Sequence, residues 1–177
     1  MNINLGCGKN KLEDYINVDA DPEMNPDVVL VLGKDKFPWE TESIDRVVMG
    51  HTLEHIPRDF HFRILNEINR VLKIDGDLMV SFPDFEKISK NYLENLHGVQ
   101  DFWEKTIYGR RLTPWDYHVC AMVGIDFCRF IKDFGFHKIQ LSCEVNADYN
   151  SVVYARKAFT LTPKEELLRR DIRGENH

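Results

Sequence analysis

The chain has 177 residues, of which 29 are acidic and 23 are basic, so its formal net charge is −6. This length suits one domain, and with 43% hydrophobic residues the chain has too much apolar surface to bury for a disordered protein. An acidic balance argues against a nucleic-acid partner, because nucleic-acid binders usually carry a basic patch.

Nothing in the sequence predicts a membrane or export segment. No apolar run reaches the ~18 to 20 residues of a membrane span, and no basic stretch leads into an apolar one at the N-terminus. The four cysteines form no CxxC pair and are too few for a disulfide framework: Cys7, Cys120, Cys128 and Cys143. We therefore expect a cytoplasmic protein with reduced thiols and no membrane association.

Short β-branched runs dominate the first third of the chain. They predict strands over Asn2 to Leu5, Tyr15 to Asp19, Asp27 to Leu32 and Ile44 to Met49. Helical spacing of apolar residues then predicts an amphipathic helix over Arg58 to Leu72. This alternation is typical of a parallel sheet covered by helices, so the predicted fold class is α/β.

A turn and a fifth strand follow this helix. Ile74-Asp75-Gly76 should end the helix, with Gly76 in the left-handed conformation, and Asp77 to Phe82 should form the strand. From Asp84 to Cys120 the periodicity weakens and aromatic residues gather. We therefore predict an acceptor-binding insertion or lid over residues 84–120.

The last third contains one predicted helix, from Ile125 to Phe134, and two strands, Lys138 to Cys143 and Ser151 to Arg156. A polar turn at residues 146–150 should join the strands. We expect one domain over residues 1–158 and a charged tail over residues 159–177.

The loops after the first two strands point to a ligand site. In an open α/β sheet, ligands bind at the carboxyl ends of the strands. Gly6-Cys7-Gly8 follows the first strand, where glycines let a ligand approach the backbone, although any tight turn also favours glycine. Asp19 ends the second strand, where a carboxylate can accept both hydroxyls of a ribose. The two loops together predict a nucleotide-like ligand.

Two common nucleotide motifs are absent. A dinucleotide fingerprint would need a third glycine where Lys11 stands, and Asp19 comes too early for its acidic residue. No glycine-rich stretch leads into Lys-Ser or Lys-Thr, so a P-loop is absent as well.

Six motifs occur in the order found in one large family. They are "INLGCG", "YINVD", "PDVVLVL", "SIDRVVMGHTLEHI", "LNEINRVLKIDGDLMVSFPD" and "FIKDFGF". With them the chain resembles a compact class I S-adenosylmethionine-dependent methyltransferase over most of residues 2–158. The resemblance implies a Rossmann-like, mostly parallel seven-stranded sheet with a C-terminal antiparallel hairpin.

The same resemblance implies S-adenosylmethionine as cofactor, S-adenosylhomocysteine as product, and a set of cofactor-binding residues. Gly6, Cys7 and Gly8 would face the methionine part; Asp19, with Ala20 beside it, would hold the ribose; Leu32 and Gly33 would border the adenine; and His51 would line the pocket. A purely structural role for His51 is the alternative. Relatives often have an acidic residue where this chain has Val31, which leaves the adenine contacts open.

His51 to His55 also spells HxxEH, a zinc-protease motif. Zinc would require that motif within a helix together with a third ligand, whereas here it directly follows a buried strand. Methyltransferases of this type show HxLEH at this place. We therefore expect no metal site, and capping and packing roles for Glu54 and His55.

On the acceptor side, Asp116 and His118 are the candidate catalytic residues. Histidine titrates near neutral pH, and a nearby carboxylate would orient it as a base. The alternative is a capped turn with a packed histidine. Several aromatic residues suggest a flat or sugar-like acceptor, or else form the core of the lid: Tyr92, Trp103, Tyr108 and Trp115.

We therefore expect methyl transfer to an oxygen or nitrogen of a small-molecule or glycan acceptor. The alternative is a non-catalytic subunit that binds S-adenosylmethionine or serves in assembly. Cover for the cofactor would come from the insertion, the tail or a second subunit. In the last case the protein would be a homo-oligomer.

Overall fold

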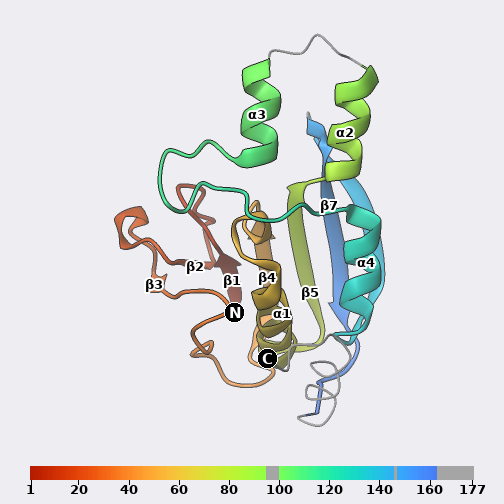
Figure 1. The fold of residues 1–177 in the computed structure, drawn as a ribbon. Helices are drawn as coiled ribbons and strands as arrows, with labels where there is room; N and C mark the ends of the chain where they lie inside the picture. Colours follow the sequence, from red (N-terminus) through yellow and green to blue (C-terminus); the bar gives the residue numbers. More distant parts are fainter. Residues whose placement is uncertain (95–99, 146, 163–177) are drawn as a thin grey trace.

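A computed structural model describes residues 1–94, 100–145 and 147–162 (Figure 1). Its centre is a seven-stranded sheet in the order β3-β2-β1-β4-β5-β7-β6. The strands are β1 Asn2–Leu5, β2 Ile16–Asp19, β3 Val28–Val29, β4 Ile44–Gly50, β5 Leu72–Pro83, β6 Phe136–Glu144 and β7 Ala147–Lys157. Neighbouring strands from β3 to β5 are parallel, whereas β7 is antiparallel to both β5 and β6. The predicted α/β fold with an antiparallel C-terminal hairpin is confirmed.

The third strand is shorter than predicted. Only Val28 and Val29 pair with β2. The chain then turns, because Asp35 accepts the N–H of Val31 at 2.7 Å and donates its own N–H to the Val31 carbonyl at 2.9 Å. Because of these local hydrogen bonds, the N–H and carbonyl of Val31 do not pair with β2, as they would in a longer strand.

Helix α1 (Arg58–Val71) follows the short 3-10 helix η2 (Leu53–His55), and β5 begins directly after α1. The predicted left-handed Gly76 is wrong: Asp75 takes that conformation, with φ of 59°. Gly76 has a different constraint, since a Cβ there would lie 2.8 Å from the Lys73 carbonyl oxygen. Close backbone approach, not the sign of φ, therefore requires glycine at this position.

The segment between β5 and α4 (Gly124–Lys132) contains two helices, α2 (Phe85–Glu94) and α3 (Gln100–Tyr108). They stand beyond the carboxyl ends of the parallel strands (Figure 1). The two ends of the segment lie side by side, because Asp84 forms a bridge with Met122 and the Phe85 N–H donates to the Met122 carbonyl at 2.8 Å. Both helices are thus held at the edge where the strand ends meet.

The C-terminal hairpin is longer than predicted. Its ladder reaches the pair Glu144 and Ala147, so the residues 147–150 assigned to a turn belong to β7. Residue 146 lies outside the described part, as does most of the predicted tail, residues 163–177. Within the described ranges, no helix combines the length and apolar character needed to cross a membrane.

Apolar side chains of the sheet, α1 and α4 form one core. Phe62 of α1 packs edge-on against Phe134 after α4, at a ring-centroid distance of 5.4 Å. Asn69 of α1 is also fully buried. Its amide donates to the carbonyls of Phe134 and Phe159 at 2.8 and 2.9 Å, and its oxygen accepts the Leu161 N–H at 3.0 Å. One polar side chain thus fastens α1 to the segments after α4 and β7.

Asn69→Ala is expected to lower the free energy of unfolding by about 2 to 4 kcal/mol, because three buried backbone groups lose their partner. Urea unfolding followed by circular dichroism measures this change. Asn66→Ala on the same helix is the matched control, since the buried Asn66 Oδ1 accepts no hydrogen bond within the described structure. Equal losses for the two variants would contradict the role given to Asn69.

Candidate functional site

The glycine turn after β1 lies where the strand order reverses, between β1 and β4. Gly6 and Gly8 have left-handed backbones, with φ of 68° and 48°. The N–H of Cys7 donates to the Val18 carbonyl at 2.9 Å, which joins the turn to β2. Cys7 itself is buried, and burial raises the pKa of its thiol, so the thiol stays protonated near neutral pH.

The two glycines face different surroundings. A Cβ on Gly6 would lie 2.3 Å from Thr52 Cγ2, so Gly6 packs directly on the segment after β4. The Thr52 hydroxyl lies 3.0 Å from the Gly50 carbonyl and 3.2 Å from that of Leu5, and it thereby holds the ends of β1 and β4 together. A Cβ on Gly8 would meet no atom of the described chain within 4 Å. Gly8 therefore borders open space that a ligand can occupy.

Asp19 is brought to the glycine turn, as the parallel pairing of β1 and β2 predicts. Its Oδ2 accepts the Gly8 N–H at 2.7 Å and its Oδ1 accepts the Asp21 N–H at 2.9 Å. A carboxylate has about four acceptor positions, so roughly two remain for other donors. The half-buried Ala20 follows directly. Asp19 thus shapes the turn and keeps capacity for hydroxyl groups.

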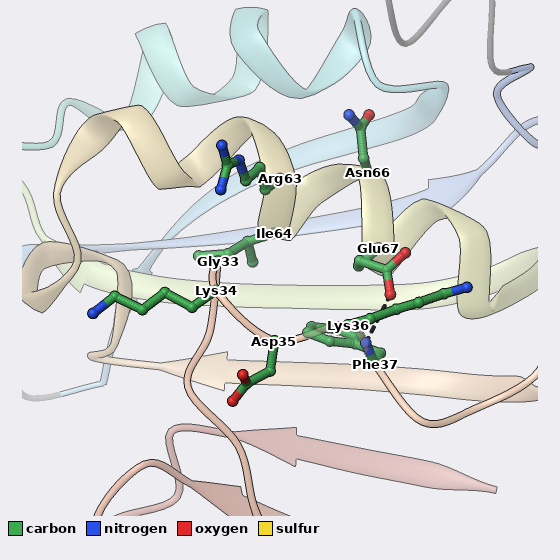
Figure 2. A pocket seen from close by; sticks show the side chains of 9 residues that line it. All are labelled: Gly33, Lys34, Asp35, Lys36, Phe37, Arg63, Ile64, Asn66 and Glu67. Atoms are coloured by element: carbon green, nitrogen blue, oxygen red, sulfur yellow. Dashed lines mark hydrogen bonds between the residues drawn. The ribbon is translucent and has the colours of Figure 1, made fainter.

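Leu32 and Gly33 lie in the turn after β3. Gly33 has a φ of 82°, and a Cβ there would lie 2.6 Å from Phe60 Cβ on α1. A shallow pocket of about 210 Å³ extends from this turn along α1 (Figure 2). In it Glu67 accepts the Phe37 N–H at 2.8 Å, while Lys34 points away. Of the predicted cofactor residues this pocket contains only Gly33, so it is separate from the turn at Gly8 and Asp19.

His51 directly follows β4 and contacts both β5 and β6 at the carboxyl end of the sheet. Its backbone has the unusual φ of 49°, and its N–H donates to the Ser81 carbonyl at 2.8 Å. The ring lies between two carboxylates, with Nδ1 3.3 Å from Glu54 Oε1 and Nε2 3.2 Å from Glu144 Oε1. Glu54 is the main cause of a raised pKa for His51, and Glu144 adds to it. A left-handed backbone in a residue other than glycine is often found at functional sites.

The two candidate catalytic residues, Asp116 and His118, do not contact each other through their side chains. The Asp116 carboxylate lies 3.8 Å from Arg110, and no hydrogen bond joins it to His118. His118 instead lies beside Glu54 and His55, with its ring edge-on to that of His55 at a centroid distance of 4.8 Å. Burial is the main cause of a lowered pKa for His118. Burial therefore favours the neutral form of the ring.

The aromatic residues of the insertion divide into two groups. Trp103 of α3 is buried and packs edge-on against Tyr92 of α2 at 6.0 Å. Tyr108 and Trp115 are about half exposed. Trp103 therefore belongs to the core of the insertion, and the other two are free to contact a ligand or partner.

Sequence reasoning missed the environment of Glu54. This carboxylate is 2% exposed and lies among His51, His55 and His118. The HxxEH spacing was the available signal for two of these histidines. The approach of His118, far along the chain, has no sequence signal.

Residues 4–80 match the family model "Methyltransferase domain". No curated protein matches the chain in sequence. Several solved structures are similar to it in fold. A S-adenosylmethionine-dependent methyltransferase of Thermotoga maritima, described as a possible histamine N-methyltransferase, aligns with a TM-score of 0.60 at 18% identity, over 88% of this chain and 81% of that one.

Two further structures are longer proteins. A possible exported protein of Bordetella parapertussis aligns with a TM-score of 0.60 at 14% identity, over 89% of this chain and 61% of that one. Human N-acetylserotonin methyltransferase, in complex with S-adenosylmethionine, aligns with a TM-score of 0.55 at 13% identity, over 89% of this chain and 47% of that one. The chain thus spans less than two thirds of these two proteins, and the likeness shows a shared fold.

Proposed function

We propose that this chain is a class I S-adenosylmethionine-dependent methyltransferase domain, and that it transfers a methyl group to an oxygen or nitrogen of a small-molecule or sugar acceptor. The match of residues 4–80 to the methyltransferase-domain family and the fold shared with solved methyltransferases support this proposal. S-adenosylmethionine is the cofactor that this family implies, and it supplies a methyl group on a positively charged sulfur. The chain's task is to hold that group in line with the acceptor atom, an effect that can contribute up to about 7 to 11 kcal/mol.

One observation carries the cofactor assignment: the Asp19 carboxylate and the open side of Gly8 lie together at the strand switch point. Glycine leaves room for a ligand against the backbone, and the free acceptor positions of Asp19 suit the two hydroxyls of a ribose. The residues present therefore fit the cofactor. We place the methionine part at Gly6, Cys7 and Gly8, and the ribose at Asp19 and Ala20.

The assignments of the adenine and acceptor sides rest on neighbouring loops. Leu32 and Gly33 are proposed to border the adenine, and His51 to line the pocket at the end of β4. His118 is the proposed proton acceptor. His118 lies in the loop that follows α3, and Tyr108 and Trp115, close to it in sequence, are about half exposed. These positions support an acceptor that enters from the side of the α2–α3 insertion.

Calorimetric titration with S-adenosylmethionine and S-adenosylhomocysteine tests the proposal directly. Both should bind one to one, and Asp19→Ala should weaken binding by about 1 to 3 kcal/mol, because hydrogen bonds to a charged group are lost. Asp126→Ala, which removes an exposed partner of Arg129 on α4, should bind normally. A folded wild-type protein that binds neither compound would refute the proposal.

Transfer of labelled methyl groups into a cell extract separates the enzyme from its alternative. Label in a small molecule or glycan supports the enzyme. Cofactor binding without transfer would instead favour a non-catalytic subunit that binds S-adenosylmethionine.

A further inference from the structure

Three side chains of the kinds that bind metal ions, from two segments far apart in sequence, meet beside the end of β4. Glu54 and His55 belong to η2, and His118 lies in the loop after α3. One carboxylate oxygen and one nitrogen from each ring all lie within 4.8 Å of one another. The cluster takes Glu54 and His55 from the HxxEH segment, without His51, and His118 is the third group.

The backbone holds these two segments together. The N–H of Val119 donates to the Glu54 carbonyl at 2.8 Å, and the N–H of His118 donates to the Tyr108 carbonyl at 3.1 Å. Gly109 allows the loop to close, since a Cβ there would lie 1.9 Å from the Asp116 carbonyl oxygen. The approach of His118 to η2 is thus built into the main chain.

Hydrogen bonds also orient both rings. His55 Nδ1 lies 3.0 Å from the Tyr117 carbonyl, and because a carbonyl only accepts, Nδ1 carries the hydrogen and Nε2 keeps a free lone pair. The His118 ring bonds to the backbone of Thr106. A histidine that binds a metal usually donates its other ring N–H to such a group, which fixes the tautomer.

The Glu54 carboxylate has too few partners for its burial. It is 2% exposed, and neither oxygen accepts a hydrogen bond of good geometry from any residue that the structure describes. His51 Nδ1, at 3.3 Å from Oε1, is its one ion-pair neighbour in the described ranges. Buried charges are normally paired and hydrogen-bonded or bound to a metal. The burial of this carboxylate beside a single ring on one side is a second observation, independent of the cluster geometry, that points to a cation ligand.

We propose that Glu54, His55 and His118 bind a divalent cation of the zinc type. Two imidazoles and one carboxylate suit Zn²⁺ and Co²⁺ better than Mg²⁺ or Ca²⁺, which prefer oxygen alone. With bonds of about 2.0 to 2.1 Å, tetrahedral ligands lie roughly 3.4 Å apart, so the three groups must close by small side-chain rotations. His51 remains outside, between Glu54 and Glu144.

Three protein ligands leave a fourth position open, as in catalytic zinc sites. If the proposed methyltransferase function holds, a hydroxyl of the acceptor bound there would lose its proton more readily, because the cation lowers its pKa. In the metal-bound protein His118 is a ligand, and the cation takes over the part in removing the acceptor's proton that is proposed above for His118 in the metal-free protein. The metal site itself does not depend on methyl transfer and is tested without the cofactor.

The test uses the untagged protein, freed of metal with a chelator and titrated with Co²⁺ and then Zn²⁺. We expect one equivalent of Co²⁺ to give the visible absorption of a tetrahedral site, and Zn²⁺ to displace it. Glu54→Gln and His118→Gln should each weaken binding by about 100-fold or more, since even outer partners of a ligand contribute 10- to 100-fold. His137→Gln is the control, because His137 pairs with Asp75 at the opposite end of β5.

Wild-type protein without the Co²⁺ spectrum, or variants that keep wild-type affinity, would overturn the metal site. If Glu54→Gln does not fold, His118→Gln alone decides, because that residue is half-buried in a loop. A separate calorimetric titration of the metal-free protein with S-adenosylmethionine tests the proposed function. Failure of the metal site would show only in the Co²⁺ and Zn²⁺ titration, and failure of the proposed function only in this one.

Discussion

Gly6→Ala should lower the free energy of unfolding by about 2 to 5 kcal/mol, and it should abolish the binding of S-adenosylmethionine at concentrations that saturate the wild type. Two costs add. The left-handed backbone disfavours any side chain, and the new methyl would overlap Thr52 Cγ2 and Oγ1. Thr52 cannot easily withdraw, because its hydroxyl lies within hydrogen-bonding distance of carbonyls on β1 and β4. Thermal unfolding and calorimetry measure the two effects.

Gly8→Ala is the matched control for stability. Gly8 has the same kind of backbone, but its Cβ would enter open space, so only the conformational cost of about 1 to 2 kcal/mol applies. A second check is the double variant Gly6→Ala/Thr52→Ala, which should regain part of the lost stability by removing the overlapping atoms. Equal destabilisation by Gly6→Ala and Gly8→Ala would show that the contact with Thr52 has no part in the effect.

Asp84→Ala should lower the free energy of unfolding by about 3 to 5 kcal/mol, because several buried donors lose one acceptor together. Asp84 is 3% exposed. Its Oδ2 accepts the Gly124 N–H at 2.9 Å and the Ser151 hydroxyl at 2.6 Å, and its Oδ1 accepts the Glu86 N–H at 3.0 Å in the first turn of α2. One carboxylate therefore joins β5, β7 and the first turns of α2 and α4.

Chemical denaturation with a two-state fit measures this loss. Asp84→Asn should lower the free energy of unfolding by less, since the one oxygen of its amide can still accept the hydrogen bonds made by one of the two carboxylate oxygens. Asp126→Ala, at an exposed position of α4, should change stability by less than about 0.5 kcal/mol. A loss for Asp84→Ala no larger than that of Asp126→Ala would contradict this role for Asp84.

The sequence pattern was sufficient to predict the part of the site that lies on neighbouring strands. In an α/β fold consecutive strands at the start of the sheet are parallel, so the carboxyl ends of β1 and β2 meet, and this brings Asp19 to Gly8. The bounds of β1 and the amphipathic face of α1 follow from the same periodicity. By contrast, the length of β3 depended on whether Asp35 would capture the Val31 N–H, a competition that side-chain alternation does not reveal.

By itself, the sequence determined the fold class, the glycine turn and the acidic end of β2, because these depend on residues close in the chain or on adjacent strands. Only the tertiary structure decided which groups surround Glu54 and why Gly76 must be glycine. His118 reaches Glu54 through a loop held by Val119, and the backbone of Asp45 from another strand approaches Gly76 in addition to the nearby Lys73 carbonyl. Such contacts join residues far apart in sequence, so their energies arise only when the core has packed and the insertion has closed on η2.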